Sequence, residues 1–143
     1  MAEHVTILQA NLQRFTGHDL IDVSDAELLS KAVFEAPFAL ISHNNEADPV
    51  FNYGNRIAMA LFEIDWQDLI KIPSRLSAEA KNRDARNALL AEVTKNNFID
   101  DYSGVRISAK GRRFQIEHAI VWNLYHNNEY YGQAAMFSQW KRL

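Results

Sequence analysis

The sequence contains no cysteine. The chain therefore cannot form disulfides, thiolate nucleophiles, cysteine zinc sites or a cysteinyl cofactor adduct. No apolar run approaches the roughly 20 residues of a membrane-spanning helix, and the first residues lack the basic and apolar regions of a signal peptide. The net charge of −3 argues against a surface dedicated to nucleic acid. These absences predict a cytoplasmic globular protein with no membrane partner and no direct nucleic-acid binding.

Recognisable catalytic motifs are also missing. The chain has no nucleophile elbow, no local serine–histidine–aspartate signature and no metal motif. Its five glycines are all expected at turns or strand kinks, so none belongs to a phosphate-binding loop. Because a dispersed catalytic triad would leave no such signature, an enzyme is unsupported rather than excluded.

The size and apolar content are those of one domain. The chain has 143 residues, 48% of them apolar, which is enough to bury a substantial core. Apolar residues recur every three or four positions over residues 5–15, which predicts a helix. We interpret residues 1–24 as a flanking segment with this helix and residues 25–143 as the main domain. A capping box at Ser24–Glu27 predicts the start of the next helix.

The remaining pattern alternates between strands and helices. Two short apolar segments predict a hairpin, three helices follow, and the period then changes to two: strands 37–43 and 50–53, helices 56–62, 66–70 and 78–95, and strands 98–109, 112–125 and 131–140. This order predicts an α+β fold with a five-stranded antiparallel sheet and helices packed on one face. On the long helix, which we expect Ser77 to cap, Leu89 and Val93 are expected to face inward and Arg86 to face water.

Several separated motifs resemble the MEKHLA family. They are Ala36–His43 (APFALISH), Asp48–Asn55 (DPVFNYGN), Pro73–Ala78 (PSRLSA), Asp101–Ser108 (DYSGVRIS), Gly111–Phe114 (GRRF), Val121–Leu124 (VWNL) and Gly132–Ala135 (GQAA). The resemblance covers roughly residues 25–140 and implies a PAS-like fold, which often holds a small molecule between the inner sheet face and the helices. The family also occurs at the C-terminus of plant class III homeodomain-leucine-zipper factors. This chain has no homeodomain, zipper or basic region, so the resemblance implies no DNA binding.

Flavin-binding PAS domains of the LOV type carry a cysteine before the long helix, and here Ser74 stands in its place. Arg75 matches the arginine that holds the flavin phosphate, and its alternative role is a surface ion pair or loop clamp. The two asparagines that read the flavin ring correspond to Arg106 and Ile116, and Gln133 is displaced by one position from the matching glutamine. The resemblance therefore argues against flavin.

Haem is not favoured either. In haem-binding PAS domains of the oxygen-sensor type the axial histidine lies on the long helix, and residues 78–95 contain no histidine. No two of the five histidines have a spacing typical of metal ligands. The resemblance names no other cofactor.

His118 is a candidate for a functional residue because of the strand around it. Alternate positions of that strand are almost all apolar: Phe114, Ile116, His118, Ile120, Trp122 and Leu124. A period of two places this set on the core side. His118 is then either a ligand contact sensitive to pH or a core histidine bonded to a backbone carbonyl. A bulge near Glu117 would exchange the two faces and remove this interpretation.

Other polar residues fall on elements that border a PAS cavity. Asp101 either points inward, with Arg112 or Arg75 as partner, or caps the end of its strand. Each of these residues also has a plausible purely structural role. The complete set of expected pocket residues is His43, Tyr53, Arg75, Asp101, His118, Trp122 and Gln133.

These observations favour a stand-alone, non-catalytic sensory module that binds a small molecule and signals through a homodimer or a partner. The dimer would form when the N-terminal helix packs on a partner's sheet beside exposed aromatic residues, namely Tyr102, Tyr130, Tyr131, Phe137 and Trp140. In the alternative arrangement the helix covers its own sheet. One alternative function is a ligand-free dimerisation module. The other is a small cavity enzyme that uses His118, Asp101 and Tyr53.

Overall fold

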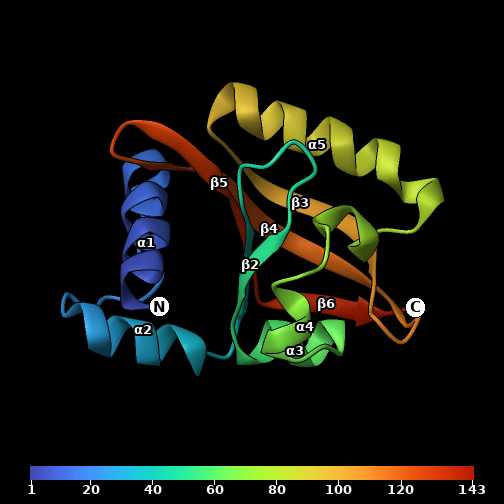
Figure 1. The fold of residues 1–143 in the computed structure, drawn as a ribbon, viewed down its shortest axis with the longest axis horizontal. Helices are drawn as coiled ribbons and strands as arrows, with labels where there is room; N and C mark the ends of the chain where they lie inside the picture. Colours follow the sequence, from blue (N-terminus) through green and yellow to red (C-terminus); the bar gives the residue numbers. More distant parts are fainter.

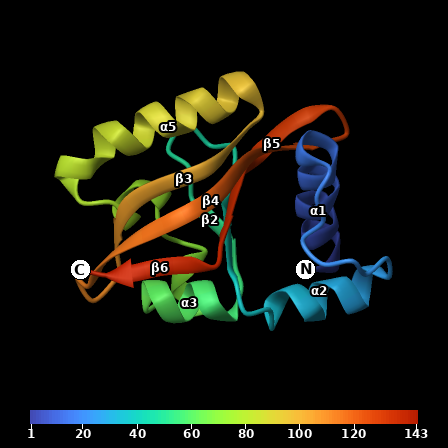
Figure 2. The same cartoon turned by 180° about the vertical axis from the view of Figure 1, so that it is seen from behind.

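The computed structural model describes all residues from 1 to 143 and contains one antiparallel sheet with helices on both faces (Figures 1 and 2). Its elements are α1 (Ala2–Thr16), α2 (Ala26–Phe34), β1 (Ala39–His43), β2 (Phe51–Gly54), α3 (Arg56–Phe62), α4 (Trp66–Leu69), η1 (Ser74–Ser77), η2 (Ala80–Asn82), α5 (Arg83–Asn96), β3 (Phe98–Ile107), β4 (Arg113–His126), β5 (Glu129–Phe137) and β6 (Gln139–Arg142). The strands follow the order β2-β1-β5-β4-β3, and β6 pairs with β4. The predicted α+β class is confirmed.

Three boundaries differ from the sequence prediction. The expected strand 131–140 is interrupted at Ser138, so it forms β5 and β6 and the sheet has six strands. The long helix begins at Arg83, because the preceding residues form the two short 3-10 helices η1 and η2. Ser77 therefore caps no long helix. Helix α2 is capped by Asp25 instead of the expected Ser24. The Asp25 carboxylate accepts a hydrogen bond from the Leu28 backbone N–H at 3.0 Å.

The side chain of Asn55 links helix α2, strand β1 and helix α3. Its side chain is fully buried and its carbonyl oxygen accepts from the backbone N–H groups of Leu40 and Ala58. Its amide nitrogen donates to the carbonyl oxygens of Val33 and Phe38. One side chain thus caps α3, as the sequence predicts, and fixes the end of α2 against strand β1.

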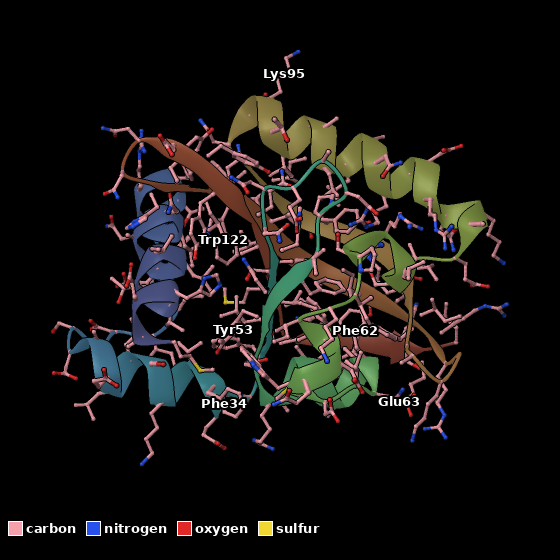
Figure 3. All side chains as sticks on the ribbon, viewed as in Figure 1. Phe34, Tyr53, Phe62, Glu63, Lys95 and Trp122 are labelled. Carbon is pink, nitrogen blue, oxygen red and sulfur yellow. The ribbon has the colours of Figure 1, made fainter.

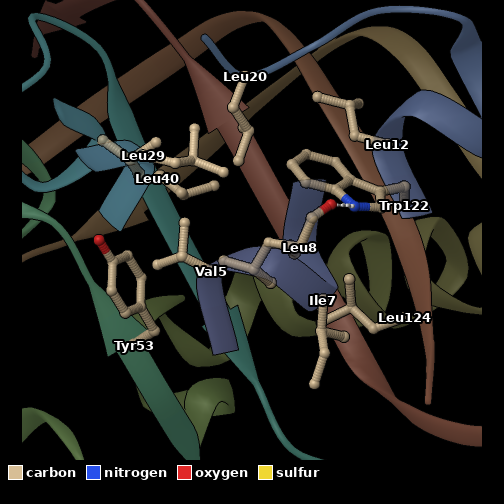
Figure 4. Packing of buried hydrophobic residues seen from close by; sticks show 12 residues of the cluster. Val5, Ile7, Leu8, Leu12, Leu20, Leu29, Leu40, Tyr53, Trp122 and Leu124 are labelled. Carbon is tan, nitrogen blue, oxygen red and sulfur yellow. Dashed lines mark hydrogen bonds between the residues drawn. The ribbon is translucent and has the colours of Figure 1, made fainter. Parts of the chain in front are cut away.

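The two faces of the sheet support separate cores. An inner core packs Ala39, Ile41 and Phe114 beneath α3 and α4, and a smaller cluster joins Val121 to α5. An outer core packs α1 and α2 against the opposite face (Figure 4). In Figure 1, α1 stands beside the twisted end of β4 and β5, far from α3 and α4. The N-terminal helix therefore covers the sheet of its own chain.

The expectation that His118 faces the core is wrong, and two facing bulges explain why. Asp101 in β3 and His118 in β4 both have positive φ, 56° and 52°, and the β3–β4 register is irregular on both sides of Tyr102. An extra residue in a strand moves the following side chains to the other face. Ile116 thus lies in the inner core and Trp122 in the outer core, while His118 is exposed.

Candidate functional site

A cavity lies between α5, η1 and the inner face of the sheet, with a volume of about 60 Å³. One water molecule needs about 10–15 Å³ by the same measure, so the cavity accommodates a ligand of a few non-hydrogen atoms. The residues that line it are Ile41, Ser42, His43, Phe51, Phe62, Ser74, Ser77, Arg86, Leu89, Leu90, Tyr102, Arg106, Ile116, Val121, Gln133, Ala134, Ala135 and Phe137. Most of these side chains are apolar, and the polar minority includes two arginines.

Both arginines are buried, with Arg86 6% exposed and Arg106 9% exposed. Arg86 on α5 donates from Nη2 to the Ser74 hydroxyl at 2.6 Å, and Nη1 lies 3.5 Å from the Asn87 side-chain oxygen. Arg106 on β3 donates from Nη1 to the Val105 carbonyl at 2.9 Å, and its guanidinium lies 5.6 Å from the centre of the Tyr102 ring. Two cationic side chains from different elements therefore line the same cavity.

The expectation that Arg86 faces water is wrong. Arg86 shares one face of α5 with Leu89 and Val93, three and seven positions further on, and all three are buried. This spacing could have predicted that Arg86 is buried, since residues at i, i+3 and i+7 lie on one helical face. The prediction of an exposed Arg86 rested on its charge alone. In the structure its side chain lines the cavity.

Neither buried arginine forms an ion pair. The arginines that pair with acids are Arg56, Arg75, Arg112 and Arg113. Burial, followed by the charge of Arg106, lowers the pKa of Arg86 to about 10. Arg86 remains a cation at neutral pH, so the cavity carries positive charge that no ion pair neutralises, and the Asp48 carboxylate offsets it only from a distance.

A neutral polar network closes one side of the cavity. His43 Nε2 lies 3.2 Å from the Gln133 side-chain oxygen, and the Gln133 amide nitrogen donates to Asn123 Oδ1 at 3.1 Å. Asn123 in turn donates to the Val93 carbonyl at 3.0 Å, which ties α5 to the sheet. Burial, followed by the charge of Arg86, lowers the pKa of His43 to about 4. His43 is therefore uncharged at neutral pH.

Of the seven residues expected in the pocket, His43 and Gln133 line this cavity. Arg75 is on the surface, where its Nε donates to the Asp48 carboxylate at 3.1 Å. Asp101 and His118 are exposed and hydrogen-bonded to each other at 2.5 Å. The structure does not bring these last two residues to the cavity, because the bulges turn them outward.

Tyr53 and Trp122, both labelled in Figure 3, belong to the outer core. Trp122 is fully buried and donates from its indole nitrogen to the Leu8 carbonyl at 3.2 Å, across the interface with α1 (Figure 4). The Tyr53 hydroxyl is the only buried side-chain nitrogen or oxygen without a hydrogen bond. Burial raises the pKa of Tyr53, so this hydroxyl is neutral.

The residues of the cavity do not fit a flavin. Ser74, in place of the LOV cysteine, already accepts a hydrogen bond from Arg86. Arg75, in place of the phosphate-binding arginine, is engaged with Asp48 on the surface. A cavity of about 60 Å³ is also small for three fused rings.

The three residues named for a cavity enzyme are not assembled either. His118 and Asp101 pair on the surface, whereas Tyr53 lies in the outer core with no hydrogen-bond partner. None of the helices combines the length and apolarity that crossing a bilayer requires.

Comparison with solved structures defines the class of fold. A PAS domain from Colwellia psychrerythraea superposes with a TM-score of 0.67 at 12% identity, over 82% of this chain and 95% of that chain. A PAS domain from a two-component sensor histidine kinase gives 0.61 at 16% identity, over 83% and 100%. The LOV domain of a blue-light activated histidine kinase from Erythrobacter litoralis gives 0.58 at 16%, over 76% and 98%. The fold is that of a PAS domain.

Comparison of the sequence with family models identifies the family within this fold. The family model of the MEKHLA domain matches residues 2–142. The chain belongs to the MEKHLA domain family, as its motifs predict, and the match begins earlier than the expected residues 25–140, so it includes α1. No curated protein matches this sequence.

Proposed function

We propose that this chain is a sensory module that binds a small molecule in the cavity beneath α5 and acts without catalysis, through contacts with a partner. The PAS-like fold and the family support the sensory class. The observation that carries ligand binding is the cavity itself, since a ligand-free interaction module would be expected to fill its interior. A ligand there touches α5 and the sheet together, so it can favour one arrangement of the two.

The proposed output is movement of α5. The helix is held to the sheet by the Gln133 and Asn123 side chains and to η1 by the Arg86–Ser74 hydrogen bond. Helix α1 occupies the outer sheet face, and two of the aromatic residues expected in the dimer contact, Tyr102 and Phe137, line the inner cavity instead. A homodimer, which we keep as a proposed mode of signalling, therefore needs a different surface. We also propose that the protein works in the cytoplasm.

Filling the cavity tests ligand binding. Ala135 lines the cavity from β5, and Ala135→Leu is expected to occupy its space and abolish ligand-induced stabilisation. The measurement is the melting temperature of the full chain against a library of small charged and neutral metabolites, with native mass spectrometry of the freshly purified protein. Ala91→Leu, on the exposed face of α5, is the matched control and should keep the wild-type response. No stabilisation of the wild type by any compound, or equal stabilisation of Ala135→Leu, would contradict the proposal.

A further inference from the structure

We propose that the ligand of this cavity is a small oxyanion, a compact molecule with a carboxylate or phosphate group, held by Arg86 and Arg106. The inference rests on the proposed function and adds the chemical class of the ligand. It concerns two residues that were not among the seven expected in the pocket.

Unused hydrogen-bond donors are the first observation. Each guanidinium has five N–H donors, and together the two arginines make three hydrogen bonds to the protein. Arg86 Nε, Arg106 Nε and Arg106 Nη2 have no partner. All three retain some accessible surface, because Tyr53 is the only residue with a fully buried and unpaired side-chain nitrogen or oxygen. These donors therefore face space that a ligand atom can reach.

Uncompensated charge is the second observation. No acid lines the cavity, and the carboxylate whose charge reaches Arg86, Asp48, is already paired to Arg75 on the surface. Burying two cations without an anion is unfavourable, and each cation raises the cost of the other. An anion between the two guanidinium groups would neutralise this charge and receive paired N–H donors, the arrangement that arginine offers to carboxylate and phosphate.

Size and polarity limit the choice further. The cavity volume of about 60 Å³ leaves room for the anionic group and a short substituent. Leu89, Val121 and Ala135 provide an apolar wall for that substituent. The cavity therefore favours inorganic phosphate or a short-chain carboxylate over a nucleotide or another bulky anion.

Isothermal titration of the full chain tests the ligand class directly. The probes are acetate, propionate, inorganic phosphate and acetamide, which is the neutral counterpart of acetate. We expect acetate, propionate or phosphate to bind at one site and acetamide to bind at least about tenfold more weakly, because it loses the charge-assisted hydrogen bonds. The carboxylate and phosphate titrations decide which oxyanion is preferred.

Variants locate the site. Arg86→Met and Arg106→Met are each expected to weaken anion binding about 10- to 100-fold. Arg75→Met, the same change at an exposed arginine, should leave it unchanged. Without ligand, Arg86→Met should melt close to the wild type, since removal of a buried unpaired cation offsets the loss of the hydrogen bond to Ser74. If Arg86→Met fails to fold, Arg86→Lys, which keeps the charge but loses the planar donor pair, should still weaken binding about tenfold.

The outcomes separate this inference from the proposed function. Binding of neutral compounds that Ala135→Leu abolishes, with no binding of the anions, would overturn the anion inference and leave the proposed function intact. Anion binding lost in Arg75→Met and retained in Arg86→Met would also overturn it. If no compound of either kind binds, both fail.

Discussion

Deleting residues 1–17 is expected to unfold the domain or leave it only marginally stable. Val5, Leu8 and Leu12 of α1 are completely buried against the sheet of the same chain. Their burial contributes about 1.5–3 kcal/mol each, and the total is comparable to the whole stability of about 5–15 kcal/mol of a typical domain. The deletion would also expose Trp122, which is 0% exposed in the intact chain.

Single substitutions give a graded form of the same experiment. Leu12→Ala should lower the free energy of unfolding by about 2–5 kcal/mol, measured by urea denaturation. Gln13→Ala, one position along and exposed, should change it by less than about 0.5 kcal/mol. A shortened chain that unfolds cooperatively at the wild-type urea concentration would show that α1 is dispensable, as expected of a helix that serves only as a flanking or dimerisation element.

Lowering the pH from 7 to 4 is expected to destabilise the protein through His4 and His43. Burial lowers the pKa of each from 6.5 to about 4, helped by the N-terminal amine for His4 and by Arg86 for His43. The unfolded chain therefore binds more protons between these values, so stability falls as the pH drops below about 6.5 and the loss is complete near pH 4. For His43 the loss amounts to about 3 kcal/mol, and for the less buried His4 it is smaller.

The two histidines have different partners. The neutral form of His4 suits a continuous chain of hydrogen bonds, in which Tyr131 donates to Nδ1, Nε2–H donates to Ser42, and Ser42 donates to Asn52. His43 faces Gln133 and the Asn44 carbonyl, beside the cation Arg86. Protonation of His4 breaks a link between α1 and the sheet, whereas protonation of His43 places a further positive charge at the cavity.

Histidine variants isolate this effect from the titration of carboxylates. His43→Gln and His4→Gln should each flatten the dependence of the unfolding free energy on pH between 6.5 and 4, measured by urea denaturation at several pH values. His18→Gln, at an exposed position, is the control and should follow the wild type. Equal pH profiles for all four proteins would mean that neither buried histidine controls acid stability.

Much of the fold was predictable because it follows local rules. The periodicity of the strands and helices, the asparagine cap at Asn55 and the separated motifs all pointed to the observed architecture. The interruption at Ser138 was not predictable from apolar spacing, since the residues on both sides continue a strand pattern. It lies where β5 stops pairing with β4 and β6 starts, close to the bulge at His118.

The candidate site was harder to predict, because it depends on which face each residue occupies. One inserted residue at His118 exchanges the faces of β4, so Trp122 moves from the expected cavity side to the outer core. His43 and Gln133 were expected in the pocket and line it, since β1 and β5 pair without a register shift. Arg86 was missed because a charged residue is normally exposed. Arg106 stands in place of an asparagine that reads the flavin ring in LOV domains, but only the assembled cavity shows that its charge is buried together with that of Arg86.

The most direct test of the central claim is a titration of the isotopically labelled full chain with acetate, followed through the arginine Nε–H signals in NMR spectra. Binding in the cavity predicts saturable shifts of the Arg86 and Arg106 signals, because both Nε–H groups lack a partner in the protein. The Arg75 signal should stay constant, since its Nε already donates to Asp48. Shifts that do not saturate, or that are largest at Arg75, would contradict a ligand-binding cavity built around two buried arginines.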